Sequence, residues 1–256
     1  MNRSLLIQLV RRDFASRYAG TAMGFFWNVL NPILQLAIYA IVFGKFLGLR
    51  ADLGGRAQDY TAFLCSGVIP WVGLQDGILK SCTVLVENRS LIRRSSFPLA
   101  FLPLSAAISS FLSTAIAMTL LLAFLIGVAH VEWSVWFLMV PVLLVAQTVL
   151  VFGLGLVLSA MTVFVRDVAQ LMGVVLMVVF WMTPIVYSPE HIPARLSPYL
   201  AWSPTAALTS GYRDVLLLAR PPSHRDLALI AGSGSAALVL GFVVSKRLGR
   251  DIVSEI

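Results

Sequence analysis

The stretch RRDFASRYAGTAMGFFWNVLNP, residues 11–32, sets the arrangement of the whole chain. It begins with basic residues, passes Gly20 and Gly24, and becomes an apolar run that continues to Phe43. Basic residues followed by a long apolar run are typical of a chain that lies along a membrane surface and then turns into the bilayer. The stretch therefore predicts a membrane protein whose first span begins at about residue 22.

The composition of the whole chain supports this prediction. Hydrophobic residues make up 59% of the 256 residues and charged residues 12%, whereas charged residues make up about a quarter of a soluble domain. Several continuous apolar runs approach or exceed the roughly 20 residues that cross a hydrocarbon core. The net charge of +7 comes largely from basic residues beside these runs, so we expect contacts with membrane lipids and no nucleic-acid partner. We predict an all-α polytopic membrane protein.

The apolar runs predict six transmembrane helices in one domain that covers residues 1–256. The six helices are expected at residues 22–46, 61–86, 99–129, 135–164, 169–187 and 227–244. Residues 3–18 are predicted to form an amphipathic interface helix, because its leucines share one stripe and its arginines lie mostly elsewhere. Six spans place both termini on one side of the membrane, and the excess of lysine and arginine in short loops assigns that side to the cytoplasm.

Polar residues interrupt the first two expected spans. In the first, Asn28, Asn31 and Gln35 are expected to face protein or a watery cavity rather than lipid. In the second, Asp76 and Lys80 are four residues apart, the spacing at which helical side chains meet, so we predict an intramembrane ion pair. A proton relay is the alternative reading of Asp76, and it would need acidic partners in other spans.

Three further features stand out along the chain. The loop at residues 87–97 is short and basic. Residues 188–219 are rich in proline and contain two apolar pieces too short to span, which predicts a re-entrant or interfacial segment. Gly153, Gly155 and Ser159 form a small-residue edge of the kind along which membrane helices pack closely.

Motifs for catalysis do not appear in the sequence. It contains no CxxC, HExxH or GxSxG, and Gly44-Lys45 lacks the upstream glycine of a phosphate-binding loop. We therefore expect no enzyme activity, no cofactor and no metal site in this chain. The tryptophans near span ends fit an interfacial aromatic belt, but Trp27 and Trp181 fit a sugar-stacking surface equally well.

The order and spacing of four motifs resemble the permease subunits of polysaccharide ABC exporters, the ABC-2 class. In that family a basic interfacial helix leads through R-Y-x-x-[ST]-x-x-G-x-x-W into the first span, as residues 11–32 do here. VFVRDV at 163–168, FWMTPIVYSPEHIP at 180–193 and the SP turn with YRD at 203–214 also match. Exporters of O-antigen and teichoic acid polymers resemble the chain more closely than capsule exporters do.

This resemblance implies a homodimer whose interface forms a channel in the inner (cytoplasmic) membrane. Two copies of a separate cytoplasmic ATPase, which bind ATP and Mg²⁺, would drive export of a polysaccharide carried on undecaprenyl diphosphate. Residues 87–97, here called the coupling loop, fall where the family has its ATPase-docking helix. Residues 188–219, here called the gate segment, fall where it has re-entrant gate helices at the periplasmic mouth. The loop's arginines are also explained as topology anchors.

These implications select candidate site residues. The ATPase-coupling candidates are Arg89, Ser90, Leu91, Ile92, Arg93 and Arg94. The candidates for the entrance of the lipid diphosphate are Arg11, Arg12 and Arg17. The candidates for the channel lining are Trp27, Asn28, Asn31, Gln35, Tyr39 and Trp181.

Other functions are compatible with parts of this pattern. An ABC-2 permease that exports a small lipid or drug would share the architecture, as would a capsule polysaccharide exporter. A membrane enzyme acting on lipid-linked sugars would need converging carboxylates or histidines, and an ion channel or proton-coupled carrier would show inverted repeats with matching broken helices.

Overall fold

Long apolar helices dominate the structure, a computed structural model that describes residues 3–16, 23–48, 50–53, 56–93, 97–188, 195 and 197–255. The helices before the coupling loop are α1 (Arg3–Ser16), the 3₁₀ turn η1 (Gly24–Phe26), α2 (Trp27–Tyr39), the π-helix η2 (Ala40–Phe46) and α3 (Tyr60–Glu87). Those from the coupling loop onward are α4 (Arg89–Ile92), α5 (Phe101–Gly127), the 3₁₀ turn η3 (Val135–Met139), α6 (Val140–Phe164), α7 (Asp167–Met182), α8 (Ser197–Leu200), α9 (Pro204–Leu216) and α10 (His224–Glu255). The chain is thus an all-α polytopic membrane protein, as its sequence predicts.

Among the described residues, five helical stretches are long and apolar enough to cross a membrane. They are Trp27–Phe46, Tyr60–Glu87, Phe101–Gly127, Val135–Phe164 and His224–Gly249. The helix at the remaining expected span, α7, is apolar but has only 16 residues. It ends at Met182 because Thr183 precedes a proline and is extended, with φ −77° and ψ 134°; a residue before proline is driven out of the helical region.

Two other helix boundaries differ from those expected. The first long helix begins at Trp27 instead of residue 22, after Gly24 with a φ of +48°, a backbone conformation that glycine adopts without strain. The last helix continues to Glu255 rather than ending at residue 244. Val244, Leu248 and Ile252 follow one another at four-residue intervals and pack into an apolar cluster, so the helical periodicity continues past the span.

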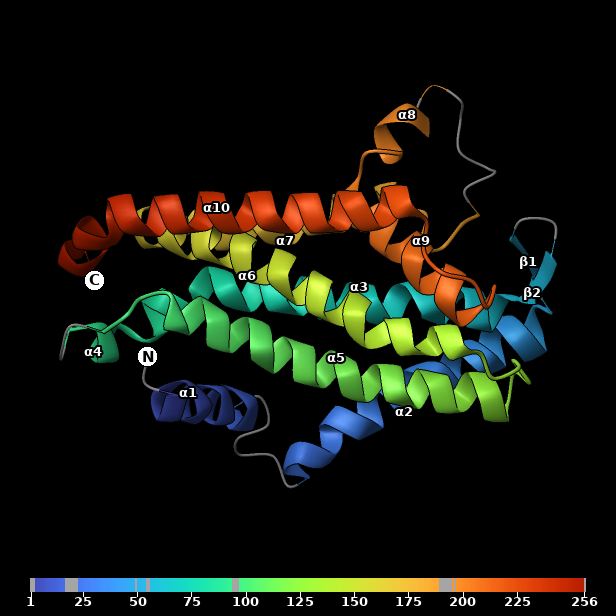
Figure 1. Ribbon diagram of the computed structural model, residues 1–256. Helices are drawn as coiled ribbons and strands as arrows, with labels where there is room; N and C mark the ends of the chain where they lie inside the picture. The colour runs from blue at the N-terminus through green and yellow to red at the C-terminus, as the bar shows by residue number, and fades with distance from the viewer. Residues whose placement is uncertain are drawn as a thin grey trace.

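Residues 50–59, expected as part of a polar loop, form an antiparallel hairpin of β1 (Arg50–Leu53) and β2 (Arg56–Asp59), with Arg50 paired to Asp59. Asp59 then caps α3, since its Oδ1 accepts a hydrogen bond of 2.8 Å from the Thr61 amide. Figure 1 shows this hairpin and α9 at one end of the bundle, with α4 and both chain termini at the other.

Helix α3 forms the centre of the bundle. In its most apolar stretch 72% of the residues are buried, compared with 6% for Trp27–Phe46. The helices α5, α6, α7 and α9 all contact α3, and their apolar side chains form the main core with it. The helix α2 lies at the edge of this core (Figure 1).

A second apolar cluster lies at the α4 end of the bundle. It joins Leu9 of α1 and Ile92 of α4 to the ends of four long helices, through Leu85, Leu102, Ala160 and Ile252 among others. Leu9 is the buried member of the predicted α1 stripe, while Arg11 and Arg12 are exposed. The amphipathic pattern of α1 is therefore confirmed, and its apolar side packs on the bundle.

The predicted small-residue edge of α6 is confirmed as a close-packing surface. A Cβ atom added at Gly153 would lie 2.6 Å from the main chain of Ala237 and Leu238 in α10, and one added at Gly155 would lie 2.7 Å from the Ser81 side chain in α3. Ser159 is buried as well. Glycine lets α6 approach two neighbouring helices at once.

Candidate functional site

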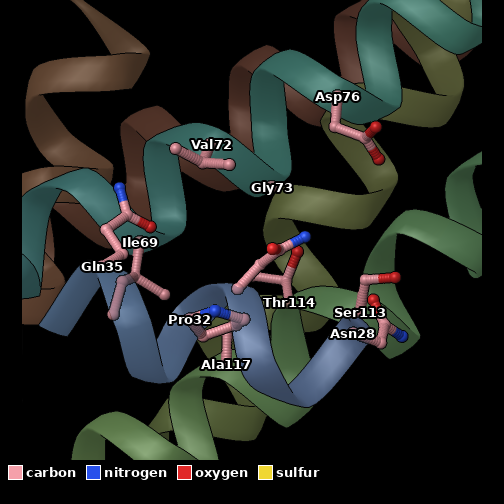
Figure 2. A pocket seen from close by; sticks show the side chains of 11 residues that line it. Asn28, Pro32, Gln35, Ile69, Val72, Gly73, Asp76, Ser113, Thr114 and Ala117 are labelled. Carbon is pink, nitrogen blue, oxygen red and sulfur yellow. The ribbon is translucent and has the colours of Figure 1, made fainter. Parts of the chain in front are cut away.

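A polar pocket of about 220 Å³ opens between α2, α3 and α5. Figure 2 shows Asn28, Pro32 and Gln35 on α2, opposite Asp76 on α3 and Ser113 and Thr114 on α5. The residues that line it are Asn28, Asn31, Pro32, Gln35, Ile69, Val72, Gly73, Asp76, Ser113, Thr114 and Ala117. Amides, hydroxyls and one carboxylate are therefore gathered on helices that are otherwise apolar.

The α2 wall carries the residues singled out in the first expected span. Asn28, Asn31 and Gln35 follow one another at three- and four-residue intervals, so the helical period places them on one face. Asn28 is buried, and the Gln35 side-chain amide donates a hydrogen bond of 3.2 Å to the Tyr39 hydroxyl. Tyr39 thus orients Gln35 from one turn beyond the pocket.

The opposite wall is rigid because α3 and α5 touch there. Ser110 donates a hydrogen bond of 2.6 Å to the Gly73 carbonyl, and Thr114 donates one of 2.8 Å to the Ser110 carbonyl. A Cβ atom at Gly73 would lie 2.0 Å from the Thr114 hydroxyl oxygen, so only glycine permits this approach. The side chains of this wall are therefore held in place and cannot readily move into the pocket.

Such a wall can bind a hydroxyl-rich ligand. Asparagine and glutamine offer both donors and acceptors, serine and threonine hydroxyls can do either, and an ionised carboxylate accepts from hydroxyl groups. Asp76 supplies the carboxylate, which the sequence analysis had assigned to an ion pair and not to the lining. The structure thus brings Asn28, Asn31, Gln35 and Asp76 together.

The two tryptophans proposed for the channel lining, Trp27 and Trp181, lie outside this pocket. Trp27 stands at the start of α2 and is not among the pocket's lining residues. Trp181 lies on α7 with 60% of its surface exposed, and its ring contacts Phe180 with centroids 5.3 Å apart. The pocket therefore uses polar groups without either indole.

Lys80 is linked to the amphipathic helix. Its Nζ lies 3.7 Å from Oδ2 of Asp13 in α1. The predicted pairing of Lys80 with Asp76 stays a prediction. Arg12 of α1 donates a hydrogen bond to the Asn88 side chain between α3 and α4, so two polar contacts fix α1 against this end of α3.

The predicted coupling loop contains a short helix, α4, joined to α3 through Asn88 alone. Ile92 is buried in the second apolar cluster, whereas Arg89, Ser90 and Arg93 are exposed. Leu91 also packs against this cluster, so apolar contacts of α4 hold a basic surface at the end of the bundle. Arg94, and Arg17 of the entrance candidates, lie outside the described residues.

Arg213, which is not among the predicted site residues, is buried in α9 with 2% of its surface exposed. Its guanidinium donates hydrogen bonds of 2.5 Å to the Pro184 carbonyl and 2.6 Å to the Ile185 carbonyl, and its Cζ lies 3.6 Å from the centre of the Phe63 ring in α3. Burial lowers the pKa of Arg213 from 12.5 to about 9, so the side chain remains charged at neutral pH. The YRD motif of the sequence contains this arginine, but nothing in the motif indicates which residues Arg213 contacts.

The adjacent Asp214 forms a separate ion pair. Arg220 contacts its Oδ1 at 2.7 Å. Burial raises the pKa of the Asp214 carboxyl, while the hydrogen bond from Arg220 acts in the opposite direction. The two consecutive charged residues of α9 thus have different partners.

Fold and pocket together describe a multi-pass helical membrane protein with polar side chains gathered around a pocket among its long apolar helices, an arrangement typical of membrane transport proteins. The sequence profile of the ABC-2 type transporter matches residues 4–217. The chain belongs to the ABC-2 type transporter family.

Named relatives are similar over nearly their whole length. The O-antigen export system permease protein RfbA of Klebsiella pneumoniae is 25% identical over 244 residues, which cover 95% of this chain and 92% of the relative. The protein of the same name from Myxococcus xanthus is 27% identical over 232 residues, covering 90% and 86%. The capsule polysaccharide export inner-membrane protein BexB of Haemophilus influenzae is more distant, at 20% identity over 246 residues, covering 95% and 91%.

Proposed function

We propose that this chain is the channel-forming permease subunit of an ATP-driven exporter, which moves a polysaccharide linked to undecaprenyl diphosphate across the inner (cytoplasmic) membrane. The polar pocket carries the proposal, because its amide, hydroxyl and carboxylate groups suit a sugar and lie on membrane-spanning helices. The full-length similarity to O-antigen permeases supports the substrate class.

The proposed assembly is a homodimer with two copies of a cytoplasmic ATPase that bind ATP and Mg²⁺. Support comes from the exposed basic surface of α4 and from its direct attachment to α3. The common placement of α4 and both termini at one end of the bundle (Figure 1) fits termini in the cytoplasm. The gate segment, at the other end through α9, would then face the periplasm.

The amphipathic helix α1 is proposed to receive the lipid diphosphate. Arg11 and Arg12 are exposed on α1, and arginine suits phosphate recognition through its planar array of donors. Because Arg12 already contacts Asn88, we assign the larger share of diphosphate binding to Arg11.

Export in cells tests the proposal. The chain and its ATPase are expressed in a strain that lacks its own permease, and polymer at the cell surface is measured. Asn31→Leu with Gln35→Leu should reduce surface polymer at least tenfold at equal protein levels, since the pocket loses two polar side chains. Ile33→Leu, at an exposed apolar position on the same helix, is the matched control and should export normally. Normal export by the double variant would rule out the pocket as part of the polymer path.

A second candidate is export of a small lipid or drug by the same architecture. The bounded pocket volume of about 220 Å³ favours it, because a single small ligand could occupy such a space. Cells with and without the chain are compared after addition of a labelled lipid or drug. If the cells without the chain accumulate the label while their surface polymer is unchanged, the result supports this candidate instead.

A further inference from the structure

We propose that Arg213 is the residue through which movement of α3 reaches α9, so that ATP-driven displacement of α4 shifts α9. This inference rests on the proposed function, and it adds a positioning residue and a path to it. Arg213 would act on the path of the polymer only through the segments it holds together.

The path begins at the coupling loop. The helix α3 has 28 residues and is followed by α4 after Asn88 alone, so α4 cannot shift without pulling on the end of α3. At 1.5 Å per residue α3 is about 42 Å long. Since it is the most buried of the long helices, and packed interiors transmit displacement rather than absorb it, its two ends are expected to move together.

The path ends at Arg213, which belongs to α9 and contacts two other segments. From α9 its guanidinium lies over the Phe63 ring of α3 at 3.6 Å, and it also reaches the Phe63 carbonyl at 3.5 Å. The same group donates to the carbonyls of Pro184 and Ile185, in the turn that follows α7. Arg213 thus connects α3, the end of α7 and the gate segment through one side chain.

The surroundings are shaped for this contact. Gly67 of α3 faces Arg213, and a Cβ atom there would lie 3.2 Å from the Nη2 atom and 3.2 Å from the Ile185 side chain. Tyr60 of α3 donates a hydrogen bond of 2.6 Å to the Val186 carbonyl, which gives α3 a second contact with the same turn. The start of α3 is therefore joined to the turn and to α9 by directional contacts as well as by apolar packing.

Arginine is required by this geometry. Its planar fork presents several donors in fixed directions, so it can hold carbonyls of different residues while its face covers an aromatic ring, whereas lysine is a point charge. The neighbouring acid Asp214 is paired with Arg220, and the guanidinium of Arg213 contacts main-chain carbonyls and an aromatic ring. The Nε of Arg213 has no hydrogen-bond partner among the described residues. No hydrogen bond of Nε is therefore lost when the side chain moves away from these contacts.

The test uses the full complex in lipid nanodiscs, with a fluorophore on Ser210→Cys, an exposed position of α9. Cys65 and Cys82 are fully buried, so the label goes to the new cysteine. The label signal is recorded on addition of ATP, together with ATPase rate and polymer export. The variant Arg213→Met is compared with Arg225→Met, a matched control because Arg225 also donates to a carbonyl, that of Ala201, and lies over a ring, that of Trp202, outside α3.

We expect ATP to change the label signal in the parent complex and in Arg225→Met, and the change to be at least fivefold smaller in Arg213→Met while its ATPase rate stays within about twofold. Arg213→Lys should restore only part of the signal. If Arg213→Met does not assemble, Tyr60→Phe with Phe63→Leu weakens the same link from α3 and should give the same loss.

An equal signal change in the Arg213 variants, or no change in the parent complex, would overturn the inference. A parent complex whose label responds to ATP but which exports no polymer would instead contradict the proposed substrate and leave this inference standing.

Discussion

The contact between α6 and α10 makes a quantitative prediction for Gly153→Ala. A Cβ atom at this position would lie 2.6 Å from the Ala237 carbonyl carbon and the Leu238 nitrogen, whereas ordinary van der Waals contact begins at 3.4 Å. The two helices would therefore have to separate by about 0.8 Å, which is the difference between these distances. The clashing atoms belong to the main chain, so a side-chain rotation cannot relieve them.

The cost of this separation follows from packing energetics. Overpacking a well-packed core costs about 1–3 kcal/mol, and replacing glycine by alanine in a helix returns up to about 1 kcal/mol. We expect Gly153→Ala to lower the free energy of unfolding by up to about 2 kcal/mol. Gly232→Ala in α10 is the matched control, since nothing lies within 4 Å of its added Cβ, and it should be neutral or stabilising.

Reversible unfolding in mixed micelles, followed by tryptophan fluorescence as SDS is added, measures both variants. A further check uses Gly241, whose added Cβ would lie 2.8 Å from the Gly153 carbonyl oxygen. Once one alanine has separated the helices, the second should cost less, so the double variant should lose less stability than the sum of the single losses. Equal stability of Gly153→Ala and Gly232→Ala would refute the close contact between α6 and α10.

Three further predictions concern the α4 end of the bundle. Arg93→Glu with Arg94→Glu should reduce the ATPase recovered with the purified chain at unchanged membrane insertion; full recovery and full export would show that these arginines serve topology alone. A double-mutant cycle of Asp13→Asn and Lys80→Met should give a coupling of up to about 1 kcal/mol, because the pair is partly exposed, and no coupling would remove this link between α1 and α3. Arg11→Gln should abolish stimulation of the ATPase by lipid-linked substrate, and unchanged stimulation would exclude Arg11 from diphosphate binding.

Local patterns in the sequence were sufficient for most of the helices. Residues within a few helical turns determine three of these features. They are the α1 stripe around Leu9, the small-residue edge at Gly153 and the short helices on either side of residue 203. The early end of α7 could also have been predicted, because Pro184 acts on the residue before it. The extension of α10 follows from its four-residue apolar spacing, which continues through Ile252.

Contacts between distant segments could not be predicted in the same way. Arg213 reaches Phe63, 150 positions earlier in the chain, and nothing near either residue marks the other as a partner. The contact of Lys80 with Asp13 could not be predicted for the same reason. The spacing of Lys80 to Asp76 is visible in the sequence, whereas its contact with Asp13 exists only because α1 folds back on α3.

The two least apolar long helices have different reasons for their polarity. The mean hydropathy of the apolar stretch is 1.4 in Tyr60–Glu87 and 1.6 in Trp27–Phe46, compared with 2.4 in Val135–Phe164. In α3 the polar groups have partners within the chain: Trp71 donates to Gln75, and Gln147 of α6 donates to the Pro70 carbonyl at 3.0 Å. A central helix meets protein on most sides, so packing and hydrogen bonding constrain its sequence more than lipid does.

That explanation does not extend to α2, because only 6% of the apolar stretch Trp27–Phe46 is buried. Its polar residues instead border a pocket, and Ile33, which the helical period places on the opposite side of α2, is exposed. A helix with one polar and one apolar side, largely exposed at the edge of the chain, fits the wall of a polar passage. The polarity of α2 is therefore a stronger argument for transport than that of α3, although α3 is the more unusual span by sequence.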